Sequence, residues 1–274
     1  MEHFIREINP EECKETMIRN KENVSRERAL IRYQIWSNVR NRSKNDRLGK
    51  IWLIVNPLVT SLIYVFVFTV IRANMNTMNL IIGITIYGVF SVSVRSGVSS
   101  IKDYRGGIYA ERISTKVLVL GMLGNRIINT QFQTIGAAIV LIFIFDIDVL
   151  TSLSLILIST IFGIIVEGFM LNFAKLIRNI PDLNNIIQHT IQLLFYASPV
   201  LYSFDQTNGL HRLFNSYNPI MYFIEFHRGL INERFAFGEI NQIILLIIIS
   251  FLIIMSIRGY KTIDRVRWEL STWS

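Results

Sequence analysis

Two neighbouring apolar stretches decide the fold class of this chain. Residues 51–71 read IWLIVNPLVTSLIYVFVFTVI, and residues 73–94 read ANMNTMNLIIGITIYGVFSVSV, with no charged side chain in either stretch. A helix needs about 20 mainly apolar residues to cross roughly 30 Å of hydrocarbon. Each stretch therefore predicts a membrane-spanning helix.

Four further stretches have the same character: residues 127–145, 149 to about 174, 183–204 and 240–257. The fourth predicted span contains Glu167, and the fifth contains His189. For His189 we favour a neutral, hydrogen-bonded ring over a proton-relay role. Six spans predict an all-α membrane protein whose two termini lie on the same side.

The composition supports this class. The chain has 274 residues, of which 51% are hydrophobic and 18% charged, with a formal net charge of +8. Its mean hydropathy is +0.40. Soluble domains average about 25% charged residues, and a disordered chain would be less apolar. A single cysteine, Cys13, excludes a disulfide framework.

The distribution of Lys and Arg orients the spans. Of the 28 basic residues, 24 fall on the side that holds both termini and 4 on the other side. Cytoplasmic loops are enriched in Lys and Arg, so both termini are predicted to be cytoplasmic, in a multi-pass protein of the cytoplasmic membrane. The first 50 residues lack the apolar core of a signal peptide.

Residues 1–48 are predicted to be a cytoplasmic arm, and residues 49–274 a six-helix transmembrane domain. Within the arm, residues 24–40 read VSRERALIRYQIWSNVR. Their apolar stripe is Ile31, Ile35 and Val39, widened by Leu30, Tyr33 and Trp36. Together with four arginines it predicts an amphipathic helix in the membrane interface. Packing on a partner protein is the alternative, and the two are compatible.

The segment 205–239, between the fifth and sixth spans, is apolar but contains no run long enough to cross. Such segments are re-entrant or interfacial. Non-helical backbone at membrane depth is either buried in protein or lines a wet cavity. The sequence therefore predicts re-entrant helices at an outer gate.

Catalytic and metal-binding motifs are missing. The sequence contains no G-x-x-x-x-G-K-[ST], H-E-x-x-H, G-x-S-x-G or C-x-x-C motif, and its histidines lack metal-ligand spacing. Asp146 and Asp148 form a D-x-D that we interpret as a solvated turn, because Asp favours turns. The sequence predicts no enzyme, no metal site, no cofactor of its own and no nucleic-acid partner.

One carboxylate lies inside a predicted span. Glu167 and Arg126 lie at compatible depths on neighbouring spans, and intramembrane charges normally pair. We expect an ion pair that either positions an inner gate or only holds the helices together. The proline of Asn56-Pro57 predicts a kink in the first span, beside a pathway or within a packed bundle.

Several motifs then combine. A basic amphipathic helix precedes Leu48-Gly49-Lys50-Ile51-Trp52 and Asn56-Pro57; the fifth span ends in LFYASPVLY at residues 194–202; Tyr217-Asn218-Pro219 is followed by Glu225 and Arg228. In this order they resemble the permease subunits of ABC exporters for polysaccharides (O-antigen or capsule type) and teichoic acids. The resemblance covers nearly the whole chain from about Val24.

The resemblance implies partners for this chain. Two permease copies would pair, and two separate ATPase subunits, which bind ATP and Mg, would dock on the cytoplasmic side. Two loops, at residues 99–116 and 175–185, would contact the ATPases. The second loop has Arg178-Asn179 where relatives often have Arg-Asp. The predicted coupling residues are Ile101, Lys102, Asp103, Tyr104, Arg105, Lys175, Arg178, Asn179 and Asp182.

The resemblance also implies a lipid-linked glycan or teichoic acid polymer as the substrate. Its diphosphate would meet a basic cytoplasmic rim at Arg40, Arg42 and Lys50, because guanidinium groups match phosphates well. Aromatic planes suit sugar rings, so the channel and gate candidates are Tyr64, Phe68, Tyr87, Phe195, Tyr196, Pro199, Tyr202, Asn218 and Pro219. The alternatives are an ABC exporter of drugs or small lipids, a membrane-embedded enzyme of lipid-linked sugar metabolism and, least favoured, a proton-coupled transporter.

Overall fold

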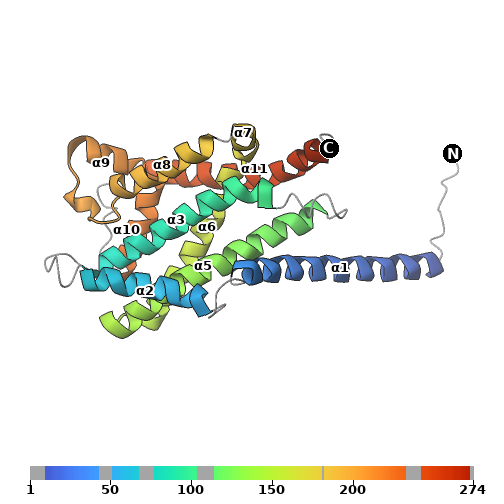
Figure 1. Cartoon of the computed structure of the whole chain (residues 1–274), viewed down its shortest axis with the longest axis horizontal. Helices are drawn as coiled ribbons and strands as arrows, with labels where there is room; N and C mark the ends of the chain where they lie inside the picture. Colours follow the sequence, from blue (N-terminus) through green and yellow to red (C-terminus); the bar gives the residue numbers. More distant parts are fainter. Residues whose placement is uncertain are drawn as a thin grey trace.

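The structure, a computed structural model, describes residues 10–42, 51–67, 77–103, 114–180, 182–232 and 242–271, which form helices joined by short turns and loops and contain no strand. The predicted all-α class is confirmed for these residues. Figure 1 shows the helices as a bundle. They are α1 (Pro10–Arg42), α2 (Trp52–Phe66), α3 (Thr77–Asp103), α5 (Thr115–Phe145), α6 (Val149–Leu171), α7 (Ala174–Asn179), α8 (Leu183–Ala197), the 3₁₀ helix η3 (Phe204–Gln206), α9 (Gly209–Ser216), α10 (Pro219–Asn232) and α11 (Gln242–Ser271).

Four of these helices are long and apolar enough to cross a membrane. The candidate spans within the described residues are Thr77–Ser100, Thr115–Phe145, Val149–Leu171 and Ile243–Ile263. Two other predicted spans correspond to α2 and α8, with 15 helical residues each. The length and composition of these four helices indicate an integral membrane protein.

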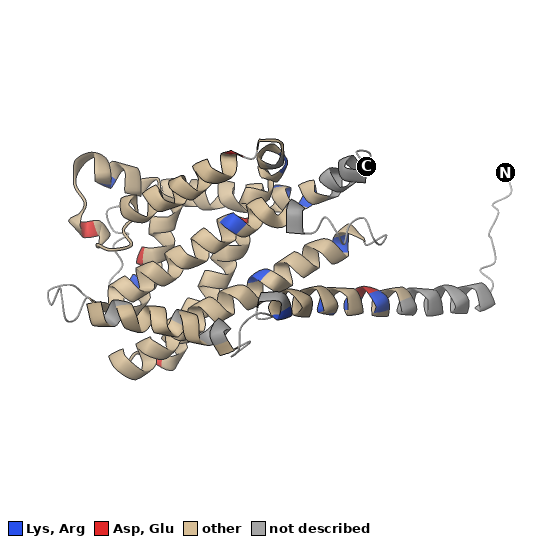
Figure 2. Ribbon diagram, viewed as in Figure 1, with Lys and Arg blue, Asp and Glu red and all other residues tan. Residues whose placement is uncertain are grey.

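The bundle has two distinct ends (Figure 1). We call the end with α9 and the α5–α6 turn the α9 end. The opposite end, with α7, the last turns of α3 and the first turns of α5, is the α7 end. Figure 2 shows that the Lys and Arg residues of the described chain gather mainly toward the α7 end and along α1.

Helix α6 lies at the centre and packs against α3, α5 and α11. Its contact with α11 is a close backbone crossing, because a Cβ added at Gly259 would overlap the carbonyl oxygen of Gly168. Small residues allow membrane helices to approach in this way. Asn172 Nδ2 adds a hydrogen bond to the Met255 carbonyl at 2.8 Å.

An apolar core fills the space between α3, α5, α6, α8 and α10. Van der Waals packing, rather than the hydrophobic effect, stabilises such contacts inside a bilayer. The least exposed members are Ile81, Ile82, Ile86, Val89, Leu141, Leu155, Phe162, Val200, Ile220 and Ile224.

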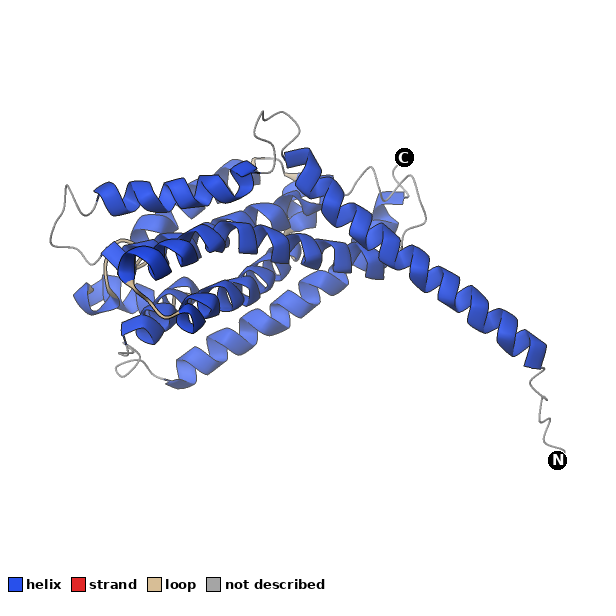
Figure 3. Cartoon of the chain, turned by 90° about the horizontal axis from the view of Figure 1, so that it is seen from below, coloured by secondary structure: helices blue, strands red, loops and turns tan. Residues whose placement is uncertain are grey.

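Helix α1 packs on α5 and then extends beyond the bundle (Figures 1 and 3). Gln34 and Ile35 lie directly over Gly121 and Gly124 of α5. The predicted apolar stripe divides in the structure: Val39 is buried, whereas Tyr33 and Trp36 are 73% and 59% exposed. Val39 thus belongs to the part of α1 that is buried within the chain, whereas Tyr33 and Trp36 stay available to the predicted membrane interface or to a partner.

The D-x-D pair forms the turn between α5 and α6. Asp146 has a left-handed backbone, with φ of 52°, and ends α5. The Asp148 carboxylate accepts hydrogen bonds from the backbone N–H groups of Leu150 and Thr151, at 2.9 and 3.3 Å, and so caps α6. Both aspartates thus have turn and cap roles, and no metal-binding group of acidic, His or Cys residues exists among the described residues.

Candidate functional site

The two predicted coupling segments lie together at the α7 end. Ile101, Lys102 and Asp103 form the last turn of α3, and α7, with Lys175, Arg178 and Asn179, packs against α3. Asp182 immediately precedes α8, without a side-chain capping bond. Tyr104 and Arg105 lie outside the described residues.

The predicted basic rim is described only in part. Arg40 lies exposed on α1, one position past the buried Val39. Arg42 is the last residue of α1, and Lys50 lies outside the described residues.

The structure brings Arg126 and Glu167 together at the junction of α3, α5 and α6. Arg126 Nε donates to Glu167 Oε2 at 2.7 Å, and both side chains are almost fully buried. The Ser96 hydroxyl of α3 donates to Glu167 Oε1 at 2.8 Å. A buried pair joined in this way links three helices. We call these three residues the α6 pair network.

This network has unused hydrogen-bonding capacity. Arg126 Nη2 and the Thr130 hydroxyl are buried and have no hydrogen-bond partner. Both side chains lie beside Gly163, where an added Cβ would come within 3.1 Å of Arg126 Cδ and 3.2 Å of Thr130 Oγ1. Arg126 thus donates to the Glu167 carboxylate through Nε, whereas its Nη2 group has no acceptor.

A second buried arginine organises the α9 end. Arg228 Nη1 donates to Glu225 Oε1 at 2.8 Å and to the Tyr202 carbonyl at 2.9 Å. Nη2 donates to the carbonyls of Asn79 and Val200, at 2.9 and 3.0 Å, and Nε donates to Asn79 at 3.1 Å. We call Arg228, Glu225 and these carbonyls the α10 arginine network.

The carbonyls explain why an arginine is needed here. Val200 and Tyr202 belong to the non-helical segment after α8, and buried backbone carbonyls need hydrogen-bond donors inside the protein. The other Glu225 contact is the backbone N–H of Phe204, at 3.2 Å. Arg228 and Glu225 therefore join α10, α3 and the segment after α8.

Two sequence motifs meet in the same region. Asn218 Nδ2 donates to the Ser198 hydroxyl at 2.8 Å, and Asn218 Oδ1 accepts from the Ile220 backbone N–H at 3.0 Å. Pro219 is the first residue of α10, a position where proline is favoured. The structure thus links the Asn218-Pro219 element to the Ser198-Pro199 element, in which Pro199 is buried.

The predicted gate aromatics take different positions. Tyr87 is buried, donates to the Ile191 carbonyl and packs edge-on to Phe195 at 5.2 Å. Tyr202 donates to the Ala197 carbonyl and lies 2.6 Å from His211 Nε2. Tyr196 is 67% exposed. Tyr87 and Phe195 are thus packed inside one chain; the Tyr64 side chain and Phe68 lie outside what the structure describes.

His227, next to Arg228, is buried and uncharged at neutral pH. Burial lowers its pKa to about 4. Its Nδ1 lies 2.7 Å from the Phe223 carbonyl, as expected for a protonated Nδ1 of the neutral ring. The positive charge at this turn of α10 therefore belongs to Arg228.

Helix α8 presents a polar face away from the bundle. Its exposed polar side chains include five that share one face of the helix: Asn185, Gln188, His189, Gln192 and Tyr196. We call them the α8 polar face. The opposite side of the helix, with Ile187, Ile191 and Leu194, is packed against the core.

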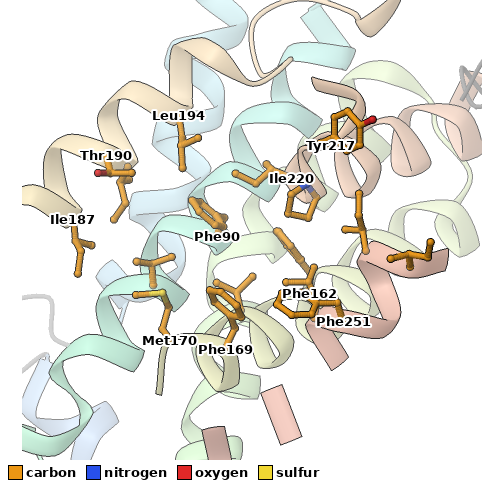
Figure 4. Close-up of a pocket in the computed structure, with 17 residues that line it drawn as sticks. Phe90, Phe162, Phe169, Met170, Ile187, Thr190, Leu194, Tyr217, Ile220 and Phe251 are labelled. Carbon is orange, nitrogen blue, oxygen red and sulfur yellow. The ribbon is translucent and has the colours of Figure 1, made fainter. Parts of the chain in front are cut away.

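Behind that opposite side lies a cavity of about 590 Å³. Figure 4 shows α8 residues on one side and Phe251 of α11 on the other, with Phe90 and Phe162 between them. Its full lining is Phe90, Val94, Phe162, Val166, Phe169, Met170, Ile187, Thr190, Ile191, Leu194, Tyr217, Pro219, Ile220, Ile247, Ile248, Phe251 and Leu252. We call it the α8–α11 pocket.

Several of these features were not assigned from the sequence. Arg228 and Glu225 were recognised only as part of a motif, although their i, i+3 spacing in an apolar segment was a signal for a buried pair. Asn185, Gln188 and Gln192 likewise have helical spacing that marks a polar face. Nothing in the sequence pattern indicated the carbonyl partners of Arg228.

The described helices and sites are those of a membrane protein with several candidate spans. Residues 29–232 match the family model described as ABC-2 type transporter. The chain belongs to this family, as the membrane-embedded permease subunit of an ABC transporter, and the predicted resemblance is confirmed at that level.

Two relatives have the same name, and the alignment with each covers most of both chains. The chain is 25% identical over 234 residues to the O-antigen export system permease protein RfbA of Myxococcus xanthus, covering 80% of this chain and 86% of the relative. It is 24% identical over 237 residues to the protein of that name from Klebsiella pneumoniae, covering 84% and 89%. ABC-2 permeases work in a membrane with an ATPase partner.

Proposed function

We propose that this permease exports a lipid-linked glycan polymer through a pathway between two copies of the chain. The observation that supports this most directly is the α8 polar face. Amide side chains exposed to hydrocarbon are unfavourable, so a polar row on a helix of a membrane bundle belongs beside water or another protein. Amide groups and an exposed tyrosine also suit sugar hydroxyls and sugar ring faces.

The proposed topology has six crossings. Helices α2 and α8 would be the first and fifth, with adjoining residues completing their length. The α7 end would be cytoplasmic, because 24 of the 28 basic residues belong to the corresponding segments. The helices η3, α9 and α10 would lie re-entrant at the outer side, and α1 would lie in the cytoplasmic interface.

Two ATPase subunits would supply the energy by hydrolysing ATP with Mg. Coupling would occur where α7 meets the end of α3, through the residues named above. The diphosphate of the lipid carrier would meet Arg40, Arg42 and Lys50. The α6 pair network would hold the inner ends of α3, α5 and α6 together while the ATPases push on α7.

The names of both relatives favour an O-antigen type glycan over a teichoic acid. Export of drugs or small lipids is less well supported, because five polar side chains in a row along one helix exceed what a small apolar substrate needs. The α8 polar face therefore supports the proposed substrate class, and the names of the relatives favour one polymer within it.

The test replaces the polar row while keeping its volume. The double variant Gln188→Leu/Gln192→Leu is expected to abolish surface polymer in cells that depend on this permease, while co-purification with the ATPase stays normal. Leu193→Ala, at a neighbouring exposed apolar position, is the control and should preserve export. Unchanged export in the double variant would exclude the proposed pathway.

A further inference from the structure

The α8–α11 pocket is large, and its lining is almost entirely apolar. Its 17 lining residues offer two hydroxyl groups, those of Thr190 and Tyr217. The Thr190 hydroxyl is already donated to the Ile186 carbonyl at 2.8 Å. The pocket thus presents almost no hydrogen-bonding group to a ligand, which excludes a sugar, a phosphate or water as its main occupant.

The pocket is elongated along the helices. On α8 its lining runs from Ile187 to Leu194, and on α6 from Phe162 to Met170. With a rise of 1.5 Å per residue these stretches span roughly 10–12 Å. Tyr217, in the turn between α9 and α10, lies at one end of the pocket (Figure 4). Its partly polar ring suits the boundary between hydrocarbon and headgroups.

The two faces of α8 separate the pocket from the proposed pathway. Thr190, Ile191 and Leu194 line the pocket, whereas Gln188 and Gln192 lie on the exposed α8 polar face. A second copy that met the α8 polar face would therefore not fill the pocket. The remaining medium around α8 and α11 is the hydrocarbon of the bilayer.

We propose that the α8–α11 pocket binds one acyl chain of a membrane phospholipid, with the headgroup beside Tyr217. If a methylene takes about the share of a water molecule in liquid, roughly 30 Å³, the cavity holds about 20 methylenes. That is the size of one phospholipid tail and far less than a long polyprenyl carrier. The bound acyl chain fills the space between α8 and α11 and packs against the apolar side of α8, opposite the α8 polar face.

The experiment uses the full chain with its ATPase partner in nanodiscs. The probe is a phosphatidylglycerol with a diazirine near the end of one acyl chain, and cross-linked peptides are mapped by mass spectrometry. We expect several-fold enrichment at the pocket residues of α8 and α11 over Leu150, Leu153 and Leu157, exposed apolar residues of α6. Equal labelling of both sets would overturn the proposal.

A matched pair of variants tests occupancy. Ile248→Trp puts an indole into the pocket and should remove the enrichment, whereas Leu246→Trp, at an exposed position of the same helix, should keep it. A second arm uses a polyprenyl phosphate with the same photoreactive group. Preferential labelling of the pocket by that probe would assign the site to the carrier and refute the phospholipid.

The pocket proposal is independent of the exported substrate. If Gln188→Leu/Gln192→Leu leaves export intact but the phospholipid still labels the pocket, only the pathway is excluded. If export fails as expected but labelling is uniform, only the pocket proposal is excluded.

Discussion

The two buried arginines of this permease differ in what they bind. Arg126 makes one ion pair between α5 and α6 and keeps an unpaired Nη2. Arg228 uses all three of its guanidinium nitrogens, on Glu225 and on three backbone carbonyls. One arginine therefore acts as a contact between regular helices, whereas the other completes the backbone bonding of a region where the helices are interrupted.

This difference has a physical reason. Within the membrane, a helix satisfies the hydrogen-bonding groups of its own backbone. An ion pair between two regular helices is therefore not needed to complete their backbone hydrogen bonds. The segment from Ser198 to Ser203 has no such internal bonding pattern, and its carbonyls need donors from elsewhere. We therefore expect the α10 arginine network to be a condition for folding and the α6 pair network to be replaceable.

The largest expected effect is that of Arg228→Met. This change leaves Glu225 buried without its partner, which costs about 3–5 kcal/mol, and also leaves the Val200 and Tyr202 carbonyls without a donor. We expect little folded protein, measured as the monodisperse fraction in size-exclusion chromatography and the thermal unfolding midpoint in detergent. A midpoint equal to that of wild type would show that the network is not needed for folding.

The second prediction compares rescue at the two sites. Arg126→Met alone should destabilise the chain by about 3–5 kcal/mol, because it leaves Glu167 buried and unpaired. Adding Glu167→Met should restore most of the loss, since apolar replacement of a buried pair is often neutral. Arg228→Met/Glu225→Met should not recover, because its backbone carbonyls stay unsatisfied.

Double-mutant cycles on thermal unfolding measure both effects. The comparison between the two arginines fails if both double variants recover, or if neither does. If the Arg126→Met/Glu167→Met variant still exports polymer, the α6 pair network has only a structural role. If this variant loses export while its stability stays normal, a role of the network at an inner gate is favoured.

The smallest expected effect comes from the glycines beside the two arginines. A Cβ at Gly83 would overlap the Val200 carbonyl oxygen and lie 2.8 Å from Arg228 Nη2, whereas a Cβ at Gly163 would meet three side-chain atoms at 3.1–3.2 Å. Gly83→Ala should destabilise by about 1–3 kcal/mol and Gly163→Ala by less than about 1 kcal/mol. Equal shifts of the two unfolding midpoints would contradict this ranking.

Much of the architecture could be predicted because the bilayer constrains sequence so strongly. Long uncharged stretches identified the four confirmed candidate spans, and the scarcity of charge within them pointed to Arg126 and Glu167 as partners. The boundaries were less accurate: α3 extends past the predicted end at Val94 to Asp103. Polar residues near the end of a span can still be helical, which composition does not show.

The site at the α9 end could not be predicted to the same degree. The partners of Arg228 are carbonyl oxygens, which every residue has, so no sequence pattern distinguishes Asn79, Val200 and Tyr202. Tyr87 and Phe195 are predicted to lie near a channel, and their rings pack on each other within one chain. Whether an aromatic ring in a span faces a lumen or a neighbouring helix depends on the rotation of its own helix. Of Tyr87, Phe195 and Tyr196, only Tyr196 is strongly exposed.

The packing of α1 on α5 limits how chimeras between related exporters can be built. Gln34 and Ile35 occupy the space left by Gly121 and Gly124, and the Ser114 hydroxyl donates to Glu27 at 3.1 Å. An α1 taken from a relative brings its own side chains to these glycines. A chimera should therefore transplant α1 together with residues 114–126, so that both halves of the joint come from the same parent.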